Sequence, residues 1–247
     1  MSEVRIQFLG CGDAFGSGGR LQTCILLDLG TKRALLDCGA SSLSGLKRWG
    51  VSPNHITAIL LTHLHGDHFG GLPFFLLEAQ LVSKRTQALV VAGPSGTEAR
   101  VGEAQAILFP GSSSGQPRFP IHYLEWTDNQ PVQVDEFMVW PHQVIHASGA
   151  PAFALRIECQ GKVIAYSGDT EWTDRLIDVT RDADLFICEA YFYDKKMKYH
   201  LDYQTVIAHR AALKCRRLIL THMNDDLLRQ LERVEVETAE DGKWVTV

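Results

Sequence analysis

The sequence predicts an α/β sandwich, a fold in which helices cover a pair of packed β-sheets. Short apolar segments with strand character are interleaved with segments of helical periodicity in both halves of the chain. An apolar triplet followed by Thr-His also occurs once in each half, as Ile59-Leu-Leu-Thr-His63 and Leu218-Ile-Leu-Thr-His222. Two related halves that each bring a histidine to one edge would produce this repeat.

The length and composition favour one large domain. The chain has 247 residues, of which 45% are hydrophobic, so it can fill a substantial core. The stretch richest in Gly, Ser and Pro covers residues 111–120 and is short enough to be a loop rather than a linker. We therefore expect a single domain over residues 1–247.

The predicted elements follow from hydrophobic periodicity and from turn residues. Apolar side chains at Leu72, Phe75, Leu76 and Ala79 share a helical face, whereas Gly93-Pro94 ends a strand. Strands are predicted at residues 4–9, 23–29, 33–37, 56–61, 88–92, 121–126, 137–142, 152–158 and 162–166. Helices are predicted at residues 43–49, 70–81 and 97–108.

Charge and composition argue against several classes of partner. The 29 acidic and 24 basic residues give a net charge of −5, which repels a long polyanion such as tRNA. No apolar segment approaches the ~20 residues that a bilayer span requires, and no signal peptide is visible. The six cysteines form no Cys-x-x-Cys pair, which favours reduced thiols in a cytoplasmic protein without membrane contact.

Residues 60–71 carry the strongest chemical signal of the chain. They read Leu-Leu-Thr-His-Leu-His-Gly-Asp-His-Phe-Gly-Gly and place His63, His65, Asp67 and His68 directly after an apolar strand. Imidazole nitrogens and carboxylate oxygens together suit Zn²⁺ and similar divalent metals. A single histidine is more often a surface or capping residue, but this cluster predicts a metal site at the edge of a sheet.

This motif resembles the H-x-H-x-D-H signature of the metallo-β-lactamase superfamily. The resemblance implies a four-layered αβ/βα sandwich with one or two metal ions at the sheet edge. It also implies zinc as the metal, with manganese or iron as alternatives, and a homodimer as a frequent assembly.

Three later positions match the remaining ligands of that superfamily. They are His146, Asp169 in the sequence Tyr-Ser-Gly-Asp-Thr, and His222. His142 competes with His146, but Pro141 and the loop that follows favour His146. The resemblance assigns His63, His65 and His146 to one ion, Asp67, His68 and His222 to a second, and Asp169 to both.

The predicted centre suits hydrolysis. Two cations roughly 3.5–4 Å apart lower the pKa of a shared water, so that hydroxide exists at neutral pH, and stabilise charge on the attacked group. Asp67 would then be both a ligand and the catalytic base that orients or deprotonates this water.

Two nearby features have open or competing interpretations. Asp37, at the end of a predicted strand, is either an ordinary strand end or a group that orients a ligand histidine. The glycine-rich residues 10–19 invite a nucleotide-loop interpretation, but Phe15 stands where a G-x-G-x-x-G motif needs glycine, and a strand follows rather than a helix. We expect a turn that lines the metal cleft.

The segment around Glu189 and His200 resembles the ribonuclease Z and cyclic-phosphodiesterase branch. In that branch a Glu orients a His that assists the leaving oxygen, and these roles would fall to Glu189 and His200. An imidazole can donate a proton near neutral pH. The alternative is that His200 only precedes the helix cap at Asp202.

One departure from that branch bears on substrate size. Ribonuclease Z enzymes of the common long-arm type insert a tRNA-gripping arm where this chain has only Gln160-Gly161, a hairpin-sized connection. We therefore expect a small phosphodiester or cyclic phosphate as substrate rather than tRNA. The alternatives are a sulfate ester, carboxylic ester, thioester or lactam, tRNA 3′ processing, and a metal-binding scaffold without turnover.

The basic residues Lys195, Lys196 and Lys198 precede His200. They are the candidate cations for a spare phosphate oxygen, and a solvated loop is the competing interpretation for each of them.

Overall fold

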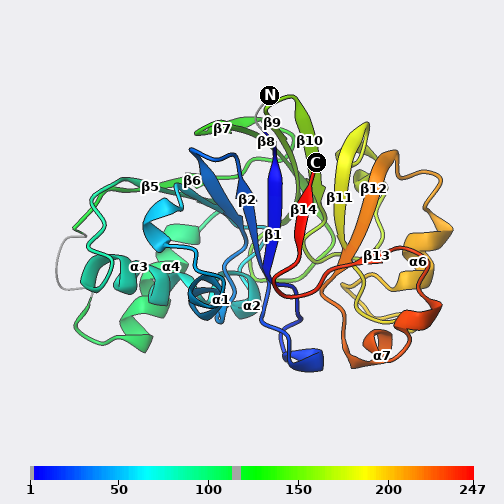
Figure 1. Cartoon of the computed structure of the whole chain (residues 1–247), viewed down its shortest axis with the longest axis horizontal. Helices are drawn as coiled ribbons and strands as arrows, with labels where there is room; N and C mark the ends of the chain where they lie inside the picture. The colour runs from blue at the N-terminus through cyan, green and yellow to red at the C-terminus, as the bar shows by residue number, and fades with distance from the viewer. Residues whose placement is uncertain (1–2, 113–117) are drawn as a thin grey trace.

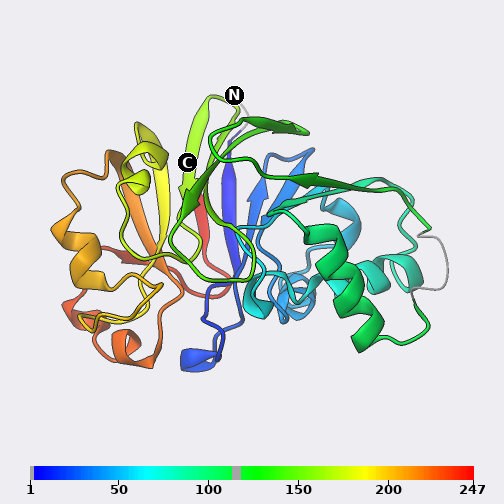
Figure 2. The same cartoon turned by 180° about the vertical axis from the view of Figure 1, so that it is seen from behind.

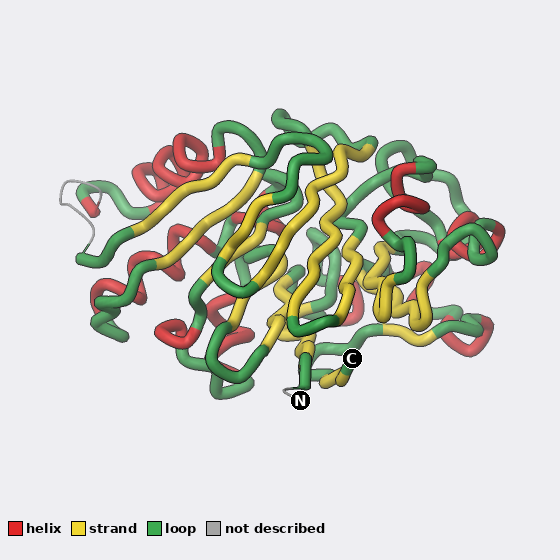
Figure 3. The backbone as a smooth tube through the Cα atoms, turned by 90° about the horizontal axis from the view of Figure 1, so that it is seen from above, coloured by secondary structure: helices red, strands yellow, loops and turns green. Residues whose placement is uncertain are grey.

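Two seven-stranded sheets pack face to face in the computed structural model, which describes residues 3–112 and 118–247. Helices cover the outer faces of both sheets (Figures 1 and 2), and the view from above shows the strands between them (Figure 3). Three clusters of buried apolar side chains separate the layers, one between the sheets and one beneath each set of helices. The predicted four-layered αβ/βα sandwich is confirmed.

The first sheet comes from the N-terminal half and one C-terminal strand. Its order is β14-β1-β2-β3-β4-β5-β6. The strands are β1 Arg5–Gly10, β2 Cys24–Asp28, β3 Arg33–Leu36, β4 Ala58–Leu60, β5 Leu89–Gly93, β6 Ile121–Glu125 and β14 Trp244–Thr246. Because β3, β4, β5 and β6 are mutually parallel, their carboxyl ends open at one edge.

The second sheet has the order β13-β12-β11-β10-β9-β8-β7. Its strands are β7 Val132–Val134, β8 Phe137–Val144, β9 Ala152–Cys159, β10 Lys162–Tyr166, β11 Ala183–Glu189, β12 Cys215–Thr221 and β13 Glu237–Thr238. Here β10, β11 and β12 are parallel, so their carboxyl ends also share an edge. The backbone N–H of Phe153 donates to the Thr62 carbonyl at 3.0 Å and joins the two edges.

The helices are short and connect the strands over the outside of the molecule. They are α1 Ser42–Arg48, α2 Gly66–Phe69, α3 Leu72–Leu81, α4 Thr97–Leu108, α5 Arg175–Val179, α6 Tyr203–Ala208 and α7 Asp225–Leu228. Single 3₁₀ turns occur at Ser17–Gly19, Pro53–His55 and Leu231–Arg233.

The sequence-based elements differ from the structure in detail. The helix predicted at residues 70–81 begins at Leu72, because the N–H of Gly71 donates to the carbonyl of Cys38 instead of continuing α2. The short strands β7, β13 and β14 were not predicted, since two or three residues carry too little periodicity. The longer strand β11, Ala183–Glu189, was also missed. Half of the predicted loop at residues 111–120 lies outside the described residues.

The connection between β9 and β10 is a tight hairpin. Cys159 pairs with Lys162, and the two residues between them, Gln160 and Gly161, have φ values of 48° and 74°. Positive φ at both central positions is the type I′ geometry that suits a two-residue hairpin. The prediction that no arm is inserted at this position is confirmed.

Among the described residues, no helix is both long and apolar enough to cross a membrane. All six cysteines are buried and unpaired.

Close backbone approach fixes the loop after β3 against the metal-binding motif. An added Cβ at Gly39 would lie 2.2 Å from the carbonyl oxygen of Asp67, whereas one at Gly102 in α4 would meet nothing within 4 Å. We expect Gly39→Ala to lower the free energy of unfolding by about 1–3 kcal/mol, because the backbone must move. Gly102→Ala should raise it by about 0.5–1 kcal/mol through helix propensity.

Chemical denaturation of both variants checks this pair. Equal effects of the two substitutions would contradict the close approach at Gly39.

Candidate metal centre

The first group of candidate ligands lies where the two sheets meet. His63 follows β4, His65 lies two residues later, and His146 follows β8. The Nε2 atom of His146 is 3.0 Å from Nδ1 of His65, and the His63 ring lies 4.6 Å from the His146 ring between centroids. The three side chains offer nitrogen atoms within 4.8 Å of one another. Residues 83 positions apart in the sequence therefore form one potential site.

The second group is fully buried. Asp67, His68, Asp169 and His222 also offer ligand atoms within 4.8 Å of one another. Nε2 of His222 lies 3.2 Å from Oδ2 of Asp67 and 3.3 Å from Nε2 of His68. Helix α2 places Asp67 and His68 side by side, while His222 follows β12 with a φ of 59°.

Asp169 lies between the two groups. Its Oδ1 atom is 3.3 Å from Nε2 of His68, and its Oδ2 atom is 3.6 Å from Nε2 of His222. The same Oδ2 atom is 3.8 Å from Nε2 of His63 and 4.0 Å from Nε2 of His146. This carboxylate therefore lies within 4.0 Å of histidines from both groups.

The side chains present fit divalent cations. Nε2 of His63 and Oδ1 of Asp169 are buried without a hydrogen-bond partner. Burial lowers the pKa of His146 to about 4, so this ring is neutral and has a lone pair to share. Burial also lowers the pKa of His222, but Asp169 and Asp67 outweigh it and raise that pKa to about 9. The second group thus favours positive charge, which a metal ion would supply.

Asp37 contacts His68, a candidate ligand, and this favours the orienting interpretation over an ordinary strand end. Its Oδ2 atom accepts hydrogen bonds from Nδ1 of His68 at 2.7 Å and from the Tyr166 hydroxyl at 2.8 Å. Its Oδ1 atom accepts from the Thr62 N–H at 2.8 Å. Because Nδ1 of His68 donates, Nε2 of this ring is left free to bind a metal.

Glu189 and His200 form a pair at the border of the second group. Nδ1 of His200 lies 3.1 Å from Oε2 of Glu189 and 3.9 Å from Oδ2 of Asp169. Burial lowers the pKa of His200, but the charge and hydrogen bond of Glu189 outweigh it, so the net pKa lies above the ordinary value. The imidazole is therefore held by a carboxylate rather than merely preceding the Asp202 cap.

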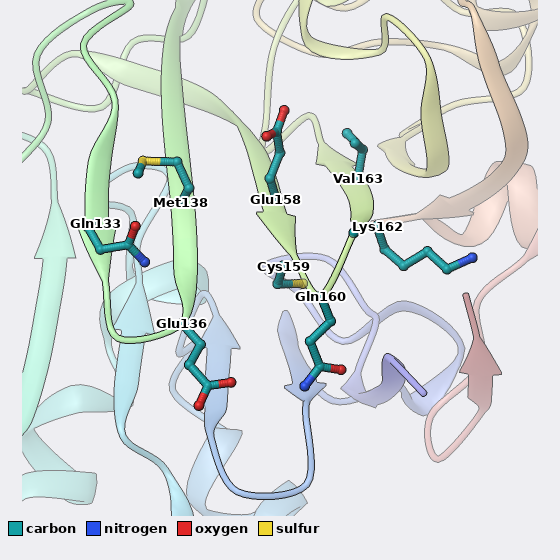
Figure 4. A pocket seen from close by; sticks show the side chains of 9 residues that line it. Gln133, Glu136, Met138, Glu158, Cys159, Gln160, Lys162 and Val163 are labelled. Atoms are coloured by element: carbon teal, nitrogen blue, oxygen red, sulfur yellow. The ribbon is translucent and has the colours of Figure 1, made fainter. Parts of the chain in front are cut away.

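A hollow of about 340 Å³ opens beside His200. It is lined by Glu171, Trp172, Lys196, Met197, Lys198, His200, Leu201, Asp202 and Thr205. A second hollow, of about 350 Å³, is lined by both polar and apolar side chains (Figure 4). It includes Cys159, which lies at the end of β9 away from the metal centre. Only the first adjoins a candidate catalytic side chain.

The three candidate lysines have different environments. The Lys196 ammonium donates to the Asp202 carboxylate at 2.8 Å, so its charge is already paired. Lys198 also lines the hollow and lies over the Tyr199 ring, 4.6 Å from its centroid. Lys195 lies over an aromatic ring outside this lining. Lys198 is thus the best placed of the three to meet an anionic substrate.

The glycine-rich loop at residues 10–19 supports the centre through its backbone. The Cys11 carbonyl accepts a hydrogen bond from the His222 N–H at 3.1 Å. The Cys11 N–H donates in turn to Asp241 at 3.0 Å, which ties the loop to the C-terminal segment. These bonds support the predicted turn beside the metal cleft.

Sequence reasoning missed Tyr199, which contacts a candidate ligand, and Glu171, which contacts Tyr199. The carbonyl of Tyr199 accepts a hydrogen bond from Nδ1 of His146 at 2.8 Å, and the Glu171 carboxylate accepts one from the Tyr199 N–H at 2.9 Å. Neither a backbone carbonyl nor an isolated Glu forms a sequence motif, so the sequence could not have predicted these contacts. The rejected ligand His142 belongs to none of the candidate ligand groups and is influenced by the charges of Arg175 and Asp128.

Comparisons with known proteins agree with this architecture. The uncharacterized protein Rv1339 of Mycobacterium tuberculosis is 31% identical over 226 residues, covering 89% of this chain and 81% of that protein. Ribonuclease Z of Pyrococcus horikoshii is 26% identical over 269 residues, covering 89% of this chain and 86% of that enzyme. The metallo-β-lactamase fold protein YhfI from Bacillus subtilis has a TM-score of 0.80 at 21% identity, with 100% of both chains covered.

A family model described as Anti-Pycsar protein Apyc1 matches residues 4–243. This match spans nearly the whole chain, including every candidate ligand. The chain therefore belongs to the Anti-Pycsar protein Apyc1 family, and it has the metallo-β-lactamase fold.

Proposed function

We propose that this protein is a binuclear metal-dependent phosphodiesterase that hydrolyses a small phosphodiester or cyclic phosphate. The observation that supports this most strongly is the Glu189–His200 pair, with His200 Nδ1 3.9 Å from the Asp169 carboxylate. Ester hydrolysis with a poor leaving group needs a proton donor in that position. His63, His65 and His146 would hold one ion, Asp67, His68 and His222 the other, and Asp169 both.

The bound cations would supply an activated water and stabilise negative charge on the phosphate. Asp67 would orient this water and take its proton, since its carboxylate lies beside both His68 and His222. Asp37 keeps the His68 ring in the tautomer that leaves Nε2 free.

His200 would donate a proton to the leaving oxygen. Glu189 accepts the Nδ1–H hydrogen bond, which leaves Nε2 as the atom that can face a substrate. The raised pKa keeps a larger fraction of the ring protonated near neutral pH. Glu189 therefore both orients the imidazole and stabilises its charged form.

The surroundings of His200 favour a small anionic substrate. The adjoining hollow of about 340 Å³ has the size of a small-molecule pocket. The β9–β10 hairpin leaves no arm at that position to grip tRNA, and the net charge of −5 disfavours a polyanion. The alignment with Pyrococcus ribonuclease Z runs over 269 residues, more than the 247 of this chain, so that enzyme has residues without a counterpart here.

Cleavage of precursor tRNA is the second candidate, because ribonuclease Z enzymes are among the relatives. It predicts tight tRNA binding, whereas the proposed function predicts weak binding.

The first prediction concerns metal stoichiometry. We expect about two divalent ions per chain, because the candidate ligands form two groups joined by Asp169. Asp169→Ala should lower the occupancy of both sites, whereas His146→Ala should lower only one. Elemental analysis of protein purified without chelator checks this. One ion in fully loaded wild-type protein would contradict the binuclear centre.

The second prediction concerns substrate size. At physiological salt the metal-loaded protein should cleave bis(p-nitrophenyl) phosphate and cyclic nucleotides better than precursor tRNA. Gel-based 3′ processing assays and tRNA binding titrations measure the comparison, with a long-arm ribonuclease Z as the positive control. Efficient 3′ trimming by this protein would favour the second candidate instead.

The third prediction separates general-acid catalysis from a structural role of His200. Substitution His200→Ala should lower the rate on an alkyl diester by ~10²–10⁴-fold, because an alkoxide needs a proton to leave. The rate on a p-nitrophenyl diester should fall far less, and both metal ions should remain bound. Steady-state kinetics on the two substrates give the comparison. An equal loss on both would assign His200 to substrate contact, and no loss would remove its catalytic role.

A further inference from the structure

Tyr199 has an unusual backbone conformation directly before the proposed general acid. Its φ is 72°, in the left-handed region that a bulky aromatic residue rarely adopts. Such conformations are strained and persist only where surrounding interactions hold them. The interactions that hold Tyr199 are therefore informative about the site.

Both peptide groups of Tyr199 are engaged with the metal-binding side of the molecule. Its N–H donates to Oε1 of Glu171 at 2.9 Å, and its carbonyl accepts from Nδ1 of His146 at 2.8 Å. The Glu171 N–H donates to the Ile145 carbonyl at 3.1 Å, so Glu171 also touches the strand end that carries His146. Because Nδ1 of His146 donates, its Nε2 atom keeps the lone pair that faces His65.

A second carboxylate completes the link between the two segments. Glu189 accepts hydrogen bonds from the Thr170 N–H through Oε1 and from His200 through Oε2. Two links thus connect residues 169–171 with residues 199–200. Glu189 bridges Thr170 and His200, and Glu171 binds the Tyr199 N–H. Moving the Tyr199 peptide would therefore move both the His146 hydrogen bond and the His200 ring.

We propose that Glu171 is a positioning residue that couples the first group of metal ligands to His200 through the Tyr199 peptide. The proposal rests on the proposed function, since it takes His146 as a ligand and His200 as the proton donor. A cation held by Nε2 of His146 would make the Nδ1–H a stronger donor to the Tyr199 carbonyl. Ordering of this peptide would then place His200 for proton transfer.

The position of Glu171 is better explained by this hydrogen bond than by contact with substrate. Its side chain lines the hollow beside His200, where a free carboxylate would repel an anionic ester. The Tyr199 N–H engages one of its oxygens, and the positive charge of Lys198 lies close enough to interact with it. The carboxylate is thus directed at the backbone.

The test compares Glu171→Ala with Glu171→Gln. The alanine variant removes the acceptor, whereas the glutamine amide oxygen can still accept the Tyr199 N–H. Asp174→Ala is the control, because this exposed carboxylate three residues away makes no capping bond to its helix. Zinc affinity is measured by competition with a chromophoric chelator, and rates are measured on alkyl and p-nitrophenyl diesters with saturating metal.

We expect Glu171→Ala to bind one of its two ions about 10–100-fold more weakly, as is typical when a group that supports a ligand is removed. The ratio of the p-nitrophenyl rate to the alkyl rate should rise by at least about tenfold, a fraction of the full general-acid effect. Glu171→Gln should restore most of both properties. Asp174→Ala should match the wild type.

One outcome would overturn the coupling: Glu171→Ala retains wild-type zinc affinity and leaving-group selectivity, whether or not its thermal stability falls. In the same assays, His200→Ala could lose more rate on the alkyl diester than on the p-nitrophenyl diester while Glu171→Ala keeps the wild-type ratio of the two rates. The proposed function then stands and the coupling fails. If His200→Ala loses the same factor on both diesters, the general-acid role fails. The zinc affinity of Glu171→Ala alone then decides whether Glu171 positions His146.

Discussion

The buried Asp37 carboxylate is the interaction on which the metal centre depends. It is fully inaccessible to solvent and accepts hydrogen bonds from Thr62, His68 and Tyr166. Tyr166 ends β10 in the second sheet, whereas Asp37 follows β3 in the first, so one carboxylate joins both sheets at the edge where the ligands gather. Leaving a buried group of this kind without a partner costs about 1–3 kcal/mol, and more when it is charged. The orientation of His68 is therefore tied to the packing of the sandwich.

The parallel strands explain why ligands distant in sequence converge. His63 follows β4, Asp169 follows β10 and His222 follows β12, and each of these strands is parallel to a neighbour in its sheet. Their carboxyl ends consequently open at the same side of the molecule. The Phe153–Thr62 backbone hydrogen bond closes the two sheets against each other there. The Thr-His repeat reflects this arrangement, because one copy lies at the end of a strand in each sheet.

Charge balance distinguishes the candidate metal centre from the neighbouring Glu189–His200 pair. Five imidazoles and two carboxylates converge in the candidate ligand set, which suits cations rather than an anionic ligand. At its border, Glu189 supports a single imidazole, His200, beside a hollow that Lys198 also lines. A phosphate ester positioned there would meet metal ions on one side and a proton donor on the other. This division of roles is what the proposed phosphodiester chemistry requires.

The sequence by itself determined the fold class and the candidate ligands, because both leave local traces. Strand and helix periodicity predicted the sandwich, and three His and one Asp within six residues predicted the metal site. Tertiary structure alone decided the supporting contacts. The role of Asp37 stayed open until Tyr166 and His68 were seen to share its carboxylate. Glu171 and the Tyr199 peptide were not foreseen, since a hydrogen bond between a side chain and a distant backbone group has no sequence pattern. Short-range periodicity and spacing record which residues share a face, whereas the orientation of a ring depends on groups that only folding brings together.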